Sequence, residues 1–131
     1  MVIVDTTVWI DYLRGSHNPQ TDWLENELTR RRLALTDLIL CEVLQGVRGD
    51  DDYIQVRNHL LKFHVFVTAD IKLAVRAAEN YRELRRRGRT VRKTIDGLIA
   101  TFCMQNNHFL LHRDRDFDQF ENELDLKVIH A

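Results

Sequence analysis

Four acidic residues lie beside strongly apolar sequence at widely separated positions of the chain. Asp5 follows VIV, Glu42 lies within LILCEVL, Asp96 lies within TIDGLIATF, and Asp114 follows FLLHR. An ionised carboxylate that leaves water is costly unless a counter-charge or a metal ion compensates for it. Bringing such acids together raises at least one of their pKa values, and a bound cation relieves the repulsion. The four residues therefore predict a carboxylate cluster that binds a metal ion.

The ligand types indicate which metal this cluster would take. The sequence has no His or Cys cluster at metal-binding spacing, and oxygen ligands favour Mg²⁺ or Mn²⁺ over Zn²⁺ or copper. Mg²⁺ binds through a few carboxylates, waters and the phosphate oxygens of a substrate, so the expected chemistry is phosphoryl transfer. The metal would polarise a phosphodiester and activate a water, while one carboxylate positions that water for attack.

Glu42 is the acid that is hardest to explain by local structure. It lies in the middle of an apolar run that begins a helix at Thr36 and Asp37, and no Lys or Arg lies within the run. Its partner must therefore come from elsewhere. Gly46 comes one turn after Glu42, and Gly97 follows Asp96, so we expect both glycines to leave space beside the acids.

Each of the other acids also suits a simpler role at a helix end. Asp5 could cap the helix that follows it, and Asp96 could complement the positive end of its own helix. Asp114 and Asp116 could cap a short helix. Glu42 has the weakest alternative of this kind, because a helix-start charge is expected one turn earlier. The joint interpretation as a metal site is favoured by topology.

The pattern of strands and helices supplies that topology. Apolar segments with β-branched residues occur at 2–4, 33–35, 64–67, 109–111 and 127–129. Helical patterns lie between them at 7–14, 20–31, 37–47, 51–61, 71–84 and 94–106, with a short helix near 117–120. This alternation predicts an α/β fold with a mostly parallel sheet of four to five short strands covered on both faces. Asp5 and Asp114 then share the edge where the strands end.

Composition adds weaker constraints. The 131 residues suit a single domain, and 19 basic against 20 acidic residues give a net charge of -1, which indicates no class of partner. The apolar runs are far shorter than the roughly 20 residues that cross a bilayer, and the MVIVD start does not look like a signal peptide, so we expect a cytoplasmic protein without a membrane partner. Cys41 and Cys103 lie in apolar helical patterns and are expected in the core.

The sequence resembles PIN-domain ribonucleases, in particular the VapC toxins of bacterial toxin-antitoxin pairs. The resemblance rests on MVIVDTTVWIDYLRG, CEVLQGVR, TVRKTIDGLIATFC and LLHRDRDFD, in this order, and covers essentially the whole chain, 1–131. It implies a PIN-like three-layer α/β/α domain. It also implies a Mg²⁺- or Mn²⁺-dependent endoribonuclease that acts as the toxin of a type II system.

The resemblance assigns roles to particular residues. Asp5, Glu42, Asp96 and Asp114 match the catalytic, metal-binding acids of the family, and Asp116 matches a further acid often found there. Thr7 matches a hydroxyl residue that orients the acids by hydrogen bonding. His112 is a departure, because many members have Thr or Ser there, and we expect it to be structural.

Partners follow from the same resemblance. These are an RNA substrate, a VapB-like antitoxin, a second copy of the chain in a homodimer, and promoter DNA bound only through the antitoxin. Within the basic stretch RELRRRGRTVRK, Arg92 and Lys93 are the favoured RNA contacts, whereas Arg85, Arg86 and Arg87 suit a solvated helix end. Trp9, Tyr12 and Leu13 could face the antitoxin or the core, and we expect the core.

Two other functions compete with the ribonuclease. Metal-assisted hydrolysis does not itself distinguish the sugar, so a structure-specific DNA nuclease is an alternative. The second is a non-catalytic RNA-binding or regulatory module of the same fold, which retention of all four acids disfavours. A haloacid-dehalogenase-type phosphatase is set aside, because the sequence after Asp5 is TT, without the second Asp that this mechanism needs.

Overall fold

The computed structural model describes residues 1–131, in which strands alternate with helices as predicted. The strands are β1 (Val2–Val4), β2 (Leu33–Thr36), β3 (His64–Phe66) and β4 (Phe109–Leu111). The helices are α1 (Thr6–Leu13), α2 (Pro19–Glu27), α3 (Asp37–Gln45), α4 (Asp50–Leu60), α5 (Ile71–Arg86), α6 (Thr94–Gln105) and α7 (Asp118–Leu124), with a short 3-10 helix, η1 (Arg115–Phe117), before α7. Every predicted helix is present, and the largest differences are at α2, which ends at Glu27 instead of residue 31, and at α7, which ends at Leu124 instead of near residue 120.

The four strands form one parallel sheet in the order β3-β2-β1-β4. The prediction of a fifth strand at 127–129 is wrong, because Val128 makes only an isolated bridge with Leu110. Backbone bonds lie on either side of this bridge, from the Leu110 N–H to the Lys127 oxygen and from the Ile129 N–H to the Leu110 oxygen. They do not continue into a ladder, so the segment contacts the sheet edge at one point.

Capping residues determine where several helices begin. Asn18 and Thr21 form a capping box at the start of α2, with Pro19 in its first turn. The side chains of Thr36 and Asp70 accept backbone N–H groups at the starts of α3 and α5. These short polar side chains satisfy donors that the first turn leaves free, so local sequence determines the helix starts.

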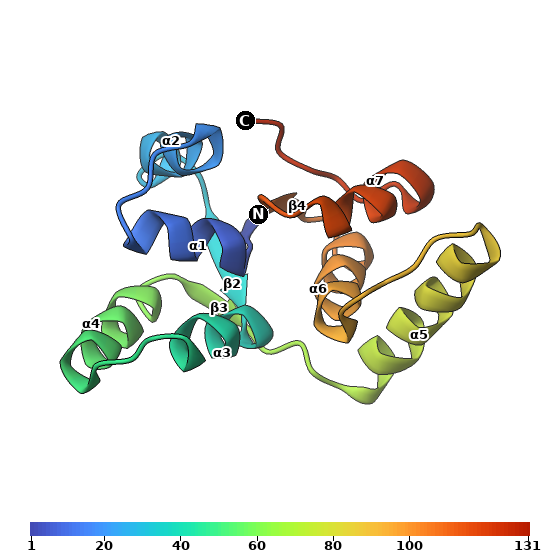
Figure 1. Ribbon diagram of the computed structural model, residues 1–131, viewed down its shortest axis with the longest axis horizontal. Helices are drawn as coiled ribbons and strands as arrows, with labels where there is room; N and C mark the ends of the chain where they lie inside the picture. The colour runs from blue at the N-terminus through green and yellow to red at the C-terminus, as the bar shows by residue number, and fades with distance from the viewer.

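The helices cover the sheet in two groups. Figure 1 shows α1, α2 and α4 on one side of the strands and α5, α6 and α7 on the other, with α3 between the two groups. Trp9, Phe117 and Phe120 are the largest fully buried side chains of the core. None of the helices combines the length and the apolar character that a membrane span requires. The α/β/α arrangement expected from the sequence is confirmed.

Some core predictions were wrong. Cys103 is buried, but Cys41 is exposed. Cys41 lies two residues from both Ile39 and Val43, which are the buried residues of α3. The Cys41 side chain therefore points away from the core. Trp9 is buried as expected, whereas Leu13 is 36% exposed at the end of α1.

The sheet order places the ends of β1 and β4 side by side. β1 pairs with β2 on one edge and with β4 on the other, so the connections leave it in two directions. The backbone N–H of Asp5 donates to the Leu111 oxygen at 2.9 Å, which joins the two strand ends. In parallel sheets such a switch point is where ligands bind, and Asp5 and Asp114 follow these two strands.

Candidate metal centre

Asp5 is held rigidly at the end of β1. Its carboxylate is buried, and Oδ2 accepts the Thr7 backbone N–H at 3.1 Å and the Thr7 hydroxyl at 2.7 Å. The Thr7 hydroxyl in turn accepts the backbone N–H of Arg113 at 3.1 Å, from the loop after β4. Asp5 is therefore both the N-cap of α1 and a fixed carboxylate at the sheet edge, so its helix-cap role does not exclude a role at the site.

Glu42 reaches the same edge from the middle of α3. Its Oε1 accepts the Thr6 hydroxyl at 2.7 Å, which links α3 to the start of α1. The hydrogen-bond partner of Glu42 is thus a neutral hydroxyl, that of Thr6. In the sequence, only the two threonines after Asp5 pointed to it. A Cβ at Gly46 would meet only backbone oxygens, at 3.6 Å or more, and one at Gly97 would meet only Val91 and Phe120, at 3.9 Å or more, so neither glycine lies directly against a carboxylate.

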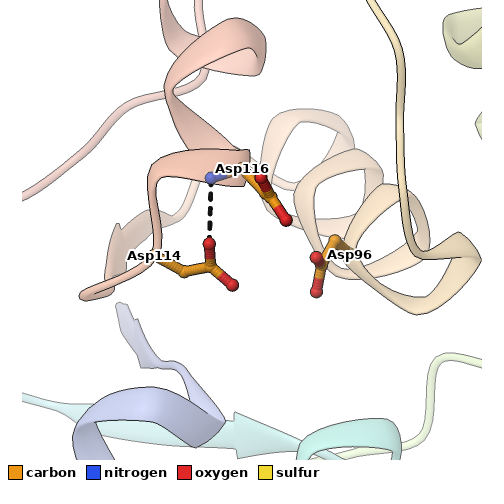
Figure 2. Close-up of side chains that lie close together, drawn as sticks. All are labelled: Asp96, Asp114 and Asp116. Carbon is orange, nitrogen blue, oxygen red and sulfur yellow. Dashed lines mark hydrogen bonds between the residues drawn. The ribbon is translucent and has the colours of Figure 1, made fainter.

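Asp96, Asp114 and Asp116 form the tightest carboxylate group. One oxygen from each lies within 4.8 Å of the others, and Figure 2 shows the side chains of Asp96 and Asp114 facing a common space from α6 and from the loop before η1. The Asp116 backbone N–H donates to Asp114 Oδ1 at 2.9 Å, which fixes the turn. This group contains Asp116 but neither Asp5 nor Glu42, so the structure does not bring all five predicted ligands into one set.

Four of the five carboxylates are nevertheless coupled electrostatically. Burial raises the pKa of Asp96 from 3.8 to about 7, Lys93 opposes this rise, and the charges of Asp5, Asp114 and Glu42 add to it. Burial likewise raises the pKa of Asp5 to about 6, against the hydrogen bonds from Thr7. The negative charge that raises the pKa of Asp96 therefore comes from the ends of β1 and β4, through Asp5 and Asp114, and from α3, through Glu42.

Lys93 is the cation nearest to this group. Its Nζ lies 3.8 Å from Asp96 Oδ2 and 3.6 Å from Asp114 Oδ2, and the charge of Asp96 is the main cause of its raised pKa. Lys93 was predicted to contact RNA alone, and these two contacts were not predicted. Its position directly before α6, with Asp96 in the first turn of that helix, was a usable signal.

His112 has a structural role at the edge of the site. Its Nδ1 accepts the backbone N–H of Asp114 at 3.1 Å, and its ring packs on Phe117 at a centroid distance of 5.0 Å. Burial lowers the pKa of His112, so the ring is neutral and its proton is on Nε2, which has no acceptor. This side chain holds the loop that carries Asp114.

The residues present fit a hard divalent cation. All the converging ligands are carboxylates, and Asp96 Oδ2 is buried without any hydrogen-bond donor. A buried, negatively charged oxygen in this state needs a cation, and Mg²⁺ and Mn²⁺ prefer such ligands. The donor set therefore agrees with the metal class expected from the sequence.

Comparison with known proteins places the chain in a family. Its sequence matches the PIN domain over residues 2–123. This chain belongs to the PIN domain family. Relatives of this PIN domain include the VapC ribonuclease Mb1587 of Mycobacterium bovis and ribonuclease VapC11 of Mycobacterium tuberculosis, each 31% identical over 123 residues that cover 90% of both chains. The resemblance to VapC ribonucleases is thus confirmed.

Solved structures share the fold of this PIN domain. VapBC2 from Rickettsia felis, bound to a DNA fragment from its promoter, matches with a TM-score of 0.79 and 16% identity, over 100% of this chain and 99% of that chain. VapC20 from Mycobacterium tuberculosis, described as a toxin that cleaves the sarcin-ricin loop, matches with a TM-score of 0.66 and 15% identity, over 90% and 93% of the two chains. At such identities the likeness concerns the fold.

Proposed function

We propose that this PIN domain is a Mg²⁺- or Mn²⁺-dependent endoribonuclease that acts as the toxin of a type II toxin-antitoxin pair. The observation that carries the proposal is the group of Asp96, Asp114 and Asp116, whose oxygens lie within 4.8 Å at the edge where β1 and β4 end. Its relatives at 31% identity are named ribonucleases. Incubating the antitoxin-free protein with RNA, with Mn²⁺ or with a chelator, and sequencing the new RNA ends tests the proposal directly.

The acidic residues have different roles in the proposed reaction, and each role follows from the contacts of the side chain. Asp96, Asp114 and Asp116 would hold the metal together with Asp5 and Glu42 at the rim of the group. When bound, the metal supplies positive charge that polarises the scissile phosphodiester and lowers the pKa of a water. Glu42 is anchored through Oε1, so Oε2 is free to accept a hydrogen bond from the attacking water. Thr7 keeps Asp5 oriented.

RNA phosphates would bind the basic side chains that have no acidic partner. Three of the seven basic residues in the stretch 82–93 are paired on the surface: Arg86 and Arg87 with Glu83, and Arg87 and Arg89 with Glu123. For Arg86 and Arg87 these pairs favour a solvated helix end. Arg82, Arg85 and Arg92 are exposed and form no ion pair, and Arg92 is the one of these three that is closest in sequence to Asp96, so it is the first candidate for a phosphate contact.

Arg92→Ala should weaken RNA binding to a similar extent for all sequences. The reason is that a phosphate contact contributes affinity through released counterions, and one lost contact lowers the slope of log K against log salt by about 0.7 for a single strand. Fluorescence anisotropy at several salt concentrations measures this slope. Arg76→Ala, which removes an exposed Arg paired with Glu79 on α5, is the control. A slope equal to that of the wild type would assign Arg92 to the solvated surface.

An antitoxin would bind in the groove between α1, α3 and α4. This groove has a volume of about 1020 Å³, and its lining includes Ile10, Leu13, Val43, Val47 and Val56. The stacked rings of Tyr12 and His59, 6.5 Å apart, lie in the same lining. Some solved structures that share the fold are toxin-antitoxin complexes, such as one from Klebsiella pneumoniae. The lining also contains charged side chains, such as Asp52 and Lys62, and a groove with both apolar and charged parts suits an amphipathic helix.

Leu13→Asp should prevent binding of the antitoxin encoded beside this chain. A charge placed on the apolar part of the groove would lose its water when the partner binds. Leu61→Asp is the matched control, because Leu61 is exposed, follows α4 and lies outside the groove. Co-purification from cells that express both chains measures binding. Equal recovery of antitoxin with Leu13→Asp and with wild type would exclude this groove.

A second copy of the chain is the remaining proposed partner. Ile71 is 84% and Val75 55% exposed, one turn apart on α5, and Val67 before this helix is 89% exposed. Such apolar side chains on one helix face support self-association. Light scattering of the antitoxin-free chain measures it.

A further inference from the structure

We propose that Lys93 is the built-in counter-ion of the carboxylate group: its ammonium neutralises Asp96 and Asp114 in the ion-free protein and must leave them when a divalent ion binds. The inference rests on the proposed function, since it takes this group to be the metal site. It concerns what occupies the site before the metal does, and it makes Lys93 a competitor of the metal.

The position of the ammonium carries the first step. Nζ lies 3.8 Å from Asp96 Oδ2 and 3.6 Å from Asp114 Oδ2, on two residues from different elements. Figure 2 shows that these two carboxylates face the same space, and Asp96 Oδ2 has no hydrogen-bond donor. Both distances exceed those of a hydrogen bond, so the ammonium acts as a point charge between the two acids and belongs to neither.

The second step is that two cations compete for one place. Asp96 and Asp114 are the acids that the ammonium contacts, and they are also two of the three acids whose oxygens lie within 4.8 Å. A divalent ion bound by the same oxygens would lie close to the ammonium, where like charges repel strongly. Binding of the ion therefore requires the ammonium to move away.

The third step is that Lys93 is built to move. Its side chain is 54% exposed, and its Nζ donates no hydrogen bond at either carboxylate. Its backbone stays fixed as the N-cap of α6, where the Lys93 oxygen accepts the Asp96 N–H at 3.2 Å. Rotation of the flexible stem can take the ammonium to solvent without disturbing the helix. There it lies beside Arg92, where it can contact an RNA phosphate.

Binding of Mn²⁺ to the RNA-free, antitoxin-free protein at pH 8 tests the proposal. Electron paramagnetic resonance of free Mn²⁺ measures the affinity of wild type, Lys93→Ala and Arg92→Ala. Removing the competing charge should make Lys93→Ala bind Mn²⁺ roughly tenfold more tightly, as expected for a unit charge a few ångströms away in a partly solvated site. Arg92→Ala removes an equal charge from the neighbouring residue without touching the acids, and its affinity should change less than about twofold, as screening of an exposed charge predicts.

The outcomes separate this inference from the proposed function. Equal or weaker Mn²⁺ binding by Lys93→Ala than by a wild type that binds Mn²⁺ overturns the role of Lys93 and leaves the metal site standing. An equal gain with Arg92→Ala also overturns it, because the effect would then be general electrostatics. If neither wild type nor Lys93→Ala binds Mn²⁺, both proposals fall.

A second variant covers loss of folding. If Lys93→Ala is unfolded without the ion, Lys93→Gln keeps a polar side chain of similar length. Its melting temperature should rise more on addition of Mn²⁺ than that of wild type, because at one ligand concentration the tighter-binding protein is stabilised more. A smaller or equal rise contradicts the competition.

Discussion

Asp96→Asn should abolish cleavage of RNA while the protein stays folded, with an expected loss of at least about 100-fold, which is the scale of removing a single electrostatic contact in an active site. The change keeps the shape of a side chain that is 4% exposed and removes the negative charge that a metal needs. Asp5→Asn should have the same effect, because it also removes a negative charge. The amide oxygen can still accept the two hydrogen bonds from Thr7, so the side chain should stay in place. Cleavage of a labelled oligoribonucleotide in Mn²⁺ measures the loss.

The control for this experiment is an acid that lies outside the group. Asp125 is exposed and has a left-handed backbone, φ 64, which Asn also adopts, so Asp125→Asn should cleave at the wild-type rate. Retained activity in both Asp5→Asn and Asp96→Asn would end the metal-site proposal. A DNA oligonucleotide of the same sequence separates the alternatives: cleavage of DNA alone indicates a DNA nuclease, and cleavage of neither indicates a binding module.

The ion-free protein should lose stability as the pH rises from about 4 to about 7. The pKa of Asp96 is raised from 3.8 to about 7 and that of Asp5 to about 6, so in this range the folded state binds more protons than the unfolded state. By linkage, the free energy of unfolding then falls with rising pH. At pH 8 the loss should reach roughly 1 to 3 kcal/mol, and Mn²⁺ should reverse it.

Comparison with Asp96→Asn isolates this effect. Burial lowers the pKa values of His108 and His112 below 6.5, and these two side chains act in the opposite direction at acidic pH. Chemical denaturation of wild type and Asp96→Asn at pH 5 and pH 8, in a chelator, cancels the histidine contribution. The variant should be more stable than wild type at pH 8, and the gain should shrink at pH 5. An equal difference between the two proteins at both pH values would show that the Asp96 carboxyl has an ordinary pKa.

The stability of the loop before α5 has a different origin. Burial would raise the pKa of Asp37, but hydrogen bonds from the Thr68 hydroxyl and from the backbone N–H groups of Thr68, Ala69 and Leu38 hold it below 3.8. Its contribution to stability is present above about pH 4 and is lost only in more acidic solution. This carboxylate therefore does not disturb the comparison between pH 5 and pH 8.

Local sequence determined the elements and one edge of the site. Period-two and period-3.6 patterns located β1 to β4 and the helices, and capping residues determined where several helices begin, because these signals depend on neighbours in the chain. The rule that parallel strands end at a common edge then placed Asp5 and Asp114 together. Residues 127–129 show the limit of local patterns: their apolar character is that of a strand, but tertiary contact allows only one bridge.

Tertiary structure alone decided which side chains meet. The contact between Thr6 and Glu42, the grouping of Asp116 with Asp96 and Asp114, and the place of Lys93 all depend on how α3 and α6 pack against the strand ends. Periodicity gives the face of a helix that is buried, but not the angle or the axial position of that helix on the sheet. Those are determined by the interlocking of core side chains, so distances of a few ångströms between polar groups could be read only from the folded chain.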